Sequence, residues 1–177
     1  MLECCAPTLV EFSLCVSGDL EVQRMDAKQE HVALDNVVRY HVYDYVMREG
    51  LPPTIAETSY ALARSSDEIR SSLQRLADEH ILVLEKGGGE VLMANPFSAV
   101  PTPFLVKAGG HSYYGNCIWD AMGVPAMLNQ DALIETSCGC CGRAMNLQIT
   151  NGSLAAAPGI AHFAIPAAHW WDDIVFN

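Results

Sequence analysis

The chain has 177 residues, of which 50% are hydrophobic and only 18% are charged, so it is long and apolar enough for one or two folded domains and is not intrinsically disordered. Ten Lys and Arg residues against 21 Asp and Glu give a formal net charge of −11, a balance that argues against nucleic-acid binding. No stretch has the length and apolar character of a membrane helix, and the segment Met1–Cys5 lacks the basic start of a signal peptide. We therefore expect a cytoplasmic protein without a membrane partner.

The seven cysteines are the first indication of chemistry. Their number is odd and no secretory signal precedes them, so free thiols with metal-binding or catalytic roles are expected rather than a disulfide framework. Cys4 and Cys5 could bind a metal, but their terminal position favours no specific role.

The first predicted elements are an N-terminal arm and an amphipathic helix. Residues 1–34 mix a short apolar run with polar residues, and we interpret them as an arm or a poorly specified strand. From Asp35 to Glu49 apolar residues recur at steps of three and four, with Asp35 placed as the N-cap and Gly50 as the stop. This spacing predicts a helix with one apolar face.

Two further helices and a hairpin follow. Thr54 begins a capping box for a short second helix, and Ser66 caps a third periodic run that reaches His80. Two apolar segments flank the glycines Gly87–Gly89, which predicts a β-hairpin. The order of three helices and a hairpin is that of a winged helix, so we predict a winged-helix-like three-helix domain over residues 35–95.

A winged helix commonly binds DNA through its third helix. Here the arginines of that region are offset by acidic residues of the same segment, namely Asp67, Glu68, Asp78 and Glu79. We therefore expect a structural or dimerising role for this domain and do not expect DNA as a partner.

The composition changes after Asn95–Pro96, where prolines and glycines break the chain into short segments. We predict that residues 96–177 form a second, small mixed α/β domain, so that the fold class is α+β. Its predicted elements are a helix at 116–124, strands at 104–108, 132–136, 144–150 and 160–165, and a turn at 151–152.

The segment Gly115–Asp120 is the most informative for chemistry. If Asn116 caps the predicted helix, Cys117 lies in its first turn, where unpaired N–H groups and the helix dipole stabilise a thiolate and lower its pKa. Asp120 follows three residues later and therefore shares a helical face with the thiol. Cys117 and Asp120 are the candidate nucleophile and its acid/base partner. The alternative is a buried structural cysteine with a surface aspartate.

A second group of thiols comprises Cys138, Cys140 and Cys141. A Cys-x-x-Cys pair can supply half of a tetrahedral zinc site, and His162 and His169 are the nearby candidates in sequence for the remaining ligands. Clustered thiolates also bind other soft metals. The three cysteines are therefore candidate metal ligands, for zinc or for a softer cation.

Together these residues resemble the alkylmercury lyase family, which cleaves carbon–mercury bonds. The resemblance implies that residues 96–177 form a lyase domain, that the activity is protonolysis of an organomercurial, and that no organic cofactor is needed. It spans most of residues 35–177 and is carried by the winged-helix-like region, by Gly115–Asp120 followed by Gly123–Ala126, and by Glu135–Cys138 leading into Gly142–Met145.

The resemblance also implies roles for single residues. Cys117 matches one of the two family thiolates that grip mercury, and Asp120 matches the family aspartate that handles the proton. Cys138 resembles a further family cysteine whose role is more structural than catalytic. The products would be a hydrocarbon and Hg(II) held by the protein, which small thiols or a mercuric reductase would accept.

One feature departs from the family pattern. The second catalytic cysteine of the family follows a segment resembling His169–Phe176, and the sequence ends at Asn177 without it. Three interpretations remain: the chain is a truncated lyase, a thiol from Cys138, Cys140 or Cys141 substitutes, or the protein binds mercury without cleaving the carbon–mercury bond. A thiol-based mercury- or zinc-binding protein is thus the main alternative, and a metal-responsive winged-helix regulator is the third.

Overall fold

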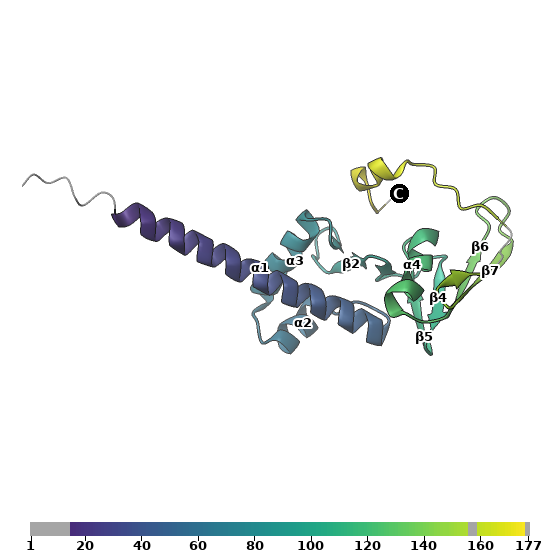
Figure 1. Ribbon diagram of the computed structural model, residues 1–177, viewed down its shortest axis with the longest axis horizontal. Coiled ribbons are helices and arrows are strands. Elements are labelled where there is room, and N and C mark those ends of the chain that lie inside the picture. Colours follow the sequence, from purple (N-terminus) through teal and green to yellow (C-terminus); the bar gives the residue numbers. More distant parts are fainter. Residues whose placement is uncertain (1–14, 156–158, 176–177) are drawn as a thin grey trace, which may run out of the picture. The chain divides into compact units, whose positions relative to one another are not determined.

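Figure 1 shows the computed structural model of the chain, in which residues 15–155 and 159–175 are described. The chain divides into two compact units. Within the described residues, the first unit comprises 15–45 and 53–91, and the second comprises 46–52 and 92–175.

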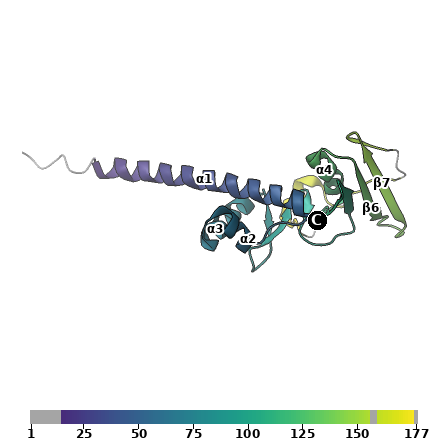
Figure 2. The ribbon, with the colours of Figure 1, turned by 90° about the horizontal axis from the view of Figure 1, so that it is seen from below.

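The first unit is built on a long helix, α1 (Cys15–Glu49), whose last residues from Val46 belong to the second unit. Figures 1 and 2 show its N-terminal part extending past the two short helices that follow. The strand considered for the region before Asp35 is therefore wrong for residues 15–34, which are helical, and the assignment of an N-terminal arm stays a prediction. These residues are rich in Glu, Gln, Lys and Ala, which favour a helix without needing an apolar stripe.

Both short helices, α2 (Ile55–Leu62) and α3 (Ser66–Asp78), begin with a capping box. The capping box at Thr54 is confirmed, since Glu57 N donates to Thr54 Oγ1 over 3.2 Å and the Glu57 carboxylate accepts from Thr54 N over 2.7 Å. On α3 the cap is Ser65, one residue before the predicted Ser66.

The contact between α1 and α3 has an apolar and an ionic part. Asp35 is not an N-cap, because it lies inside α1, where its carboxylate accepts hydrogen bonds from Arg75 over 2.8 and 2.7 Å and another from Ser72. Burial by itself raises the pKa of Asp35, but these donors outweigh it and lower the pKa. The buried apolar side chains of this unit include Val38, Val42, Ile55, Ile69, Leu73, Leu76, Leu82 and Val83.

The predicted hairpin is confirmed as strands β1 (Val83–Leu84) and β2 (Val91–Ala94). Arg70 on α3 donates over 2.8 Å to Gly88 O, which lies in the turn of the hairpin. The Glu90 carboxylate accepts from Ile55 N over 2.8 Å. Three helices and a hairpin thus occur in the predicted order, and the winged-helix assignment stays a prediction.

The second unit contains a five-stranded antiparallel sheet in the order β5-β4-β6-β7-β8. A separate antiparallel pair joins the end of β2 to β3, with Met93 opposite Ser98. Helix α4 lies between β5 and β6 in the chain, and a short 3-10 helix follows the sheet. The bounds are β3 Phe97–Ser98, β4 Leu105–Ala108, β5 His111–Tyr114, α4 Ile118–Leu128, β6 Ala132–Ser137, β7 Ala144–Thr150, β8 Ser153–Leu154 and the 3-10 helix Ala167–Asp172.

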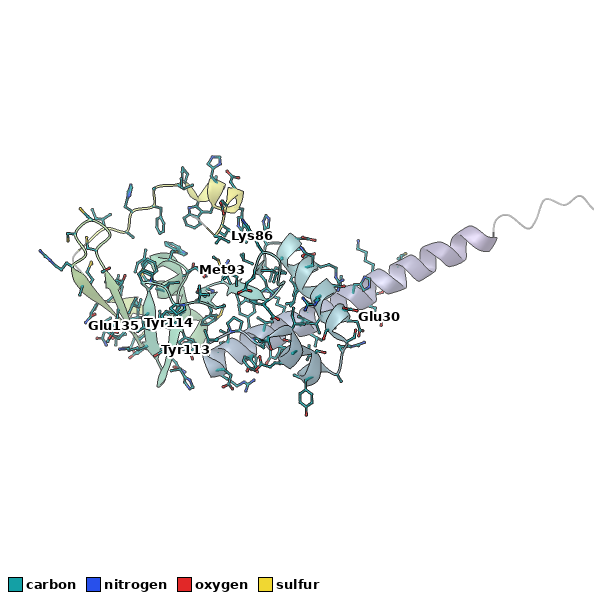
Figure 3. All side chains as sticks on the ribbon, turned by 180° about the vertical axis from the view of Figure 1, so that it is seen from behind. Glu30, Lys86, Met93, Tyr113, Tyr114 and Glu135 are labelled. Atoms are coloured by element: carbon teal, nitrogen blue, oxygen red, sulfur yellow. The ribbon has the colours of Figure 1, made fainter. Side chains whose placement is uncertain are left out.

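One face of this sheet forms the core. A row of directly opposed residues crosses it, from Tyr113 on β5 through Val106 and Ile134 to Leu147 on β7, and all four are buried. Figure 3 shows Tyr113 on this sheet, and its hydroxyl donates to Met47 O over 2.7 Å. Helix α4 contacts β4 and β6 and buries Ala121, Val124 and Pro125.

Most of the predicted elements of the second unit are confirmed, and the structure corrects two. Residues 160–165 form no strand, although their apolar residues suggested one, because no neighbouring strand pairs with them. Helix α4 begins later and ends later than predicted, and it continues through Pro125. The mixed α+β class is confirmed.

Within residues 15–155 and 159–175, none of the helices combines the length and apolarity that crossing a bilayer demands.

Candidate functional site

The candidate site starts at a glycine that fits tightly against α4. Gly115 follows β5, and its N–H donates to Phe104 O over 3.0 Å while its carbonyl accepts from Thr102 Oγ1 over 2.6 Å. A Cβ at Gly115 would lie 2.6 Å from Ala121 N and 2.8 Å from Ala121 Cα. Only glycine therefore lets the loop approach the first turn of α4 this closely, and this approach sets the positions of the next residues.

Cys117 is the N-cap of α4, the place that the sequence analysis gave to Asn116. The reason is that the Asn116 side chain bonds elsewhere, donating through Nδ2 to Asn95 Oδ1 over 3.0 Å and to Phe97 O over 3.4 Å. Cys117 has an extended backbone, and its carbonyl accepts the first helical hydrogen bond, from Ala121 N over 2.9 Å. The thiol thus lies at the start of the helix and not within its first turn.

The structure brings Cys117 and Asp120 together, as their spacing predicts. Cys117 Sγ lies 3.4 Å from Asp120 Oδ2, with the thiol as donor, and both residues are half-buried. The spacing of three residues along α4 accounts for this contact.

The lowered thiol pKa that the sequence analysis expected is wrong. Burial raises the pKa of Cys117, the charge of Asp120 raises it further, and the backbone N–H groups of Asp120 and Trp119 only partly offset them. Burial also raises the pKa of Asp120, against hydrogen bonds from Cys117 and Asn116. Both groups therefore hold their protons more tightly than exposed side chains of the same kind do.

A neutral thiol beside a carboxyl of raised pKa is suited to proton exchange. A soft cation that binds the sulfur displaces the thiol proton, and Asp120 Oδ2 is within reach to take it. Because the pKa of Asp120 is raised, this carboxyl holds the proton more readily than an exposed aspartate does and can pass it to a basic carbon. The pair can thus bind a thiophilic cation and deliver a proton at one place.

The surroundings of the pair are partly open. Trp119 on the first turn of α4 is 63% exposed, whereas Tyr113 is a core residue of the sheet. A surface hollow of about 410 Å³ is lined by Lys107–Ser112, Asp131–Leu133 and Gln148 and includes neither Cys117 nor Asp120. Its lining contains no cysteine, so the thiol chemistry lies elsewhere.

The other candidate thiols lie in the turn between β6 and β7. Cys140 and Cys141 are exposed and Cys138 is half-buried. The backbone N–H groups of Cys141 and Cys140, and next the Cys141 side chain, lower the pKa of Cys138. Of the described thiols, Cys138 rather than Cys117 is therefore the one whose thiolate is favoured. Sequence spacing carried no signal for this, because it depends on how the turn folds.

The predicted zinc cluster does not form among the described residues. In 15–155 and 159–175, no group of three or more Cys, His, Asp or Glu side chains is placed to hold a metal ion. His162 and His169 are exposed, and His169 Nδ1 lies 3.1 Å from Asp172 Oδ2. Cys4, Cys5 and Phe176 lie outside the described residues.

The second half of the chain is similar to a known protein family. Residues 97–176 match the family model of alkylmercury lyase, MerB. The solved structure of the mercury-bound form of MerB2 resembles the chain with a TM-score of 0.55 and 20% sequence identity, over 68% of this chain and 59% of that one. At this identity the likeness concerns the fold, and the chain spans less than two thirds of the length of that protein. No curated protein matches the chain.

Proposed function

We propose, from the premise that this chain belongs to the alkylmercury lyase family, that it cleaves the carbon–mercury bond of organomercurials by protonolysis, giving a hydrocarbon and Hg(II). The observation that carries the proposal is the contact of 3.4 Å between Cys117 Sγ and Asp120 Oδ2 inside the matched segment. It joins a ligand for soft mercury to a group that can hold a proton.

The first step is the binding of the organomercury cation by Cys117. Sulfur binds mercury far better than oxygen or water does, so the cation replaces the thiol proton although burial raises the pKa of the free thiol. Asp120 takes that proton, which its raised pKa favours. The Trp119 side chain, exposed on the same turn, offers an apolar surface to the organic group.

The second step is the transfer of the proton to carbon. The electron pair of the carbon–mercury bond stays with the carbon, which takes the proton from Asp120 and leaves as a hydrocarbon. Mercury stays on the Cys117 sulfur as Hg(II), and Asp120 returns to the carboxylate form. No electron is exchanged with an outside donor, so the step needs no organic cofactor.

A second sulfur on mercury would weaken the carbon–mercury bond before the proton arrives. The candidates in the described residues are Cys138, Cys140 and Cys141 on the β6–β7 turn, and a small thiol from solution would serve in the same way. Small thiols or a mercuric reductase would then remove the Hg(II) by thiol exchange.

Three arginines of the first unit argue against the alternative of a DNA-binding regulator. Arg64 pairs with Glu68 at 3.3 Å, Arg75 pairs with Asp35 at 2.7 Å, and Arg70 bonds Gly88 O. Each of these cations is thus already engaged within the unit, and the formal charge of the chain is −11. This acidic balance disfavours binding to phosphates.

The test is the release of hydrocarbon from an organomercurial. Phenylmercury is incubated with the full chain and excess small thiol, benzene is measured by gas chromatography, and protein-bound mercury is measured by elemental analysis. The proposal expects catalytic benzene release by the wild type and none by Cys117→Ser. Tight mercury binding without release of benzene would contradict the lyase function and would favour the alternative, a mercury-binding protein.

A further inference from the structure

The turn between β6 and β7 carries a thiol cluster on a fixed backbone. Cys138 N donates to Arg143 O over 2.9 Å, and Gly142 N donates to Cys138 O over 2.8 Å. Gly142 has φ +68°, the left-handed conformation that lets the chain turn back directly after Cys141 at low cost. The strands on both sides are paired up to this turn, so the thiols are held in place by β6 and β7.

Cys138 and Cys141 lie in the same tight turn, which the hydrogen bond from Gly142 N to Cys138 O closes over 2.8 Å. The Cys141 side chain and the N–H groups of Cys140 and Cys141 lower the pKa of Cys138, which agrees with this closeness. This is the arrangement of a Cys-x-x-Cys half-site, in which the backbone stabilises one thiolate and the turn places the second beside it. The Cys140 side chain is exposed.

We propose that Cys138 and Cys141 form a second binding site for Hg(II), distinct from Cys117, in which the two sulfurs hold the cation between them. Mercury(II) is satisfied by two thiolates, whereas structural zinc takes four ligands, and the described residues supply no third ligand here. As each sulfur–mercury bond forms, that thiol loses its proton to water, or to the small thiolate that delivered the mercury, and no electron is transferred.

The position of the turn suits it to passing mercury on. Cys141 is exposed, so a small thiol in solution can reach mercury on the turn, whereas Cys117 is half-buried at the start of α4. The turn would therefore hold product Hg(II) where an acceptor takes it by thiol exchange. This role in product release rests on the proposed lyase function, but the binding of Hg(II) does not.

The experiment uses the full chain with Cys117→Ser, which removes the proposed lyase chemistry from the readout. The protein is loaded with inorganic Hg(II), passed through a desalting column with excess glutathione, and analysed for mercury per chain. Adding Cys141→Ser should remove about one equivalent of retained mercury. Adding Cys140→Ser is the matched control in the same turn and should remove none, and circular dichroism checks that each variant is folded.

The proposal predicts two sulfur ligands in the X-ray absorption spectrum of the mercury-loaded Cys117→Ser protein. It is overturned if Cys141→Ser retains as much mercury as its parent, or if Cys140→Ser loses as much as Cys141→Ser does. The proposal is also overturned if Cys138 and Cys141 are two of the four ligands of a tightly held zinc ion. None of these outcomes depends on hydrocarbon release, so they leave the test of the lyase function independent.

Discussion

Replacing Asp120 with Asn should affect carbon–mercury cleavage and thiol reactivity in opposite directions. Asn has nearly the same size and can stay beside Cys117 Sγ, from which Asp120 Oδ2 is 3.4 Å away, but it cannot carry the proton. General acid/base groups contribute about 10²–10⁴-fold to a rate, so benzene release from phenylmercury should fall by at least about 100-fold if proton transfer limits it.

The same variant should make the Cys117 thiol more acidic. The carboxylate charge of Asp120 is one of the causes that raise the pKa of Cys117, so its removal shifts that pKa downward. Alkylation of Cys117, followed against pH by peptide mapping, should therefore start at lower pH in Asp120→Asn than in the wild type. Retention of Hg(II) should stay close to wild type, because the sulfur ligand is intact.

Glu135→Gln is a suitable control for this experiment, because Glu135 lies on β6 in an exposed pair with Lys107 and should affect neither readout. Near-wild-type benzene release by Asp120→Asn would show that another group protonates the carbon. A loss of cleavage accompanied by an equal loss of Hg(II) binding would show that Asp120 positions the thiol instead of supplying the proton. Either result refutes the assignment.

Three further predictions concern stability, each measured by urea or thermal unfolding. Gly115→Ala should destabilise the fold by about 1–3 kcal/mol because the new Cβ overlaps the backbone of α4, whereas Gly139→Ala, with nothing within 4 Å, should change stability by less than about 0.5 kcal/mol. Asp35→Ala should lower the free energy of unfolding by about 1.5–3 kcal/mol, because it leaves Arg75 unpaired. The pKa of Asp35 is lowered on folding, so this stabilisation is present above pH 3.8 and is lost as the pH falls further. The stabilities of the variant and the wild type should therefore become equal in acid. The pKa of Asp120 is raised on folding, so the native state binds the Asp120 proton more tightly than the unfolded state does. Ionisation of Asp120 therefore lowers the stability of the wild type as the pH rises above 3.8. Asp120→Asn should be more stable than the wild type at neutral pH and should lose this advantage at about pH 3.

Local signals in the sequence predicted much of the fold. The capping box at Thr54 and the turn at 151–152 depend on residues that are neighbours in the chain, and both occur where expected. The predicted strand at 160–165 failed because a strand also needs a partner, which an alternating pattern cannot supply. The length of α1 was missed because the sequence of its first half has no apolar stripe from which to recognise a helix.

The same distinction applies to the candidate site. The contact between Cys117 and Asp120 was predictable because it follows from helical spacing alone. The direction of the thiol pKa was not, because it depends first on how deeply the folded chain buries Cys117, which no local pattern reports. The side chain of Asn116 likewise bonds Asn95 across the fold, which moves the cap to Cys117.

The most direct test of the central claim is the isotopic composition of the hydrocarbon. Phenylmercury is incubated with the wild-type chain and a small thiol in D₂O, and the benzene is analysed by mass spectrometry. Protonolysis through the Cys117 and Asp120 pair predicts benzene carrying a single deuterium, with Hg(II) left on the protein or on the small thiol. Benzene without deuterium, or mercury that stays bound to its phenyl group on the protein, would contradict the account.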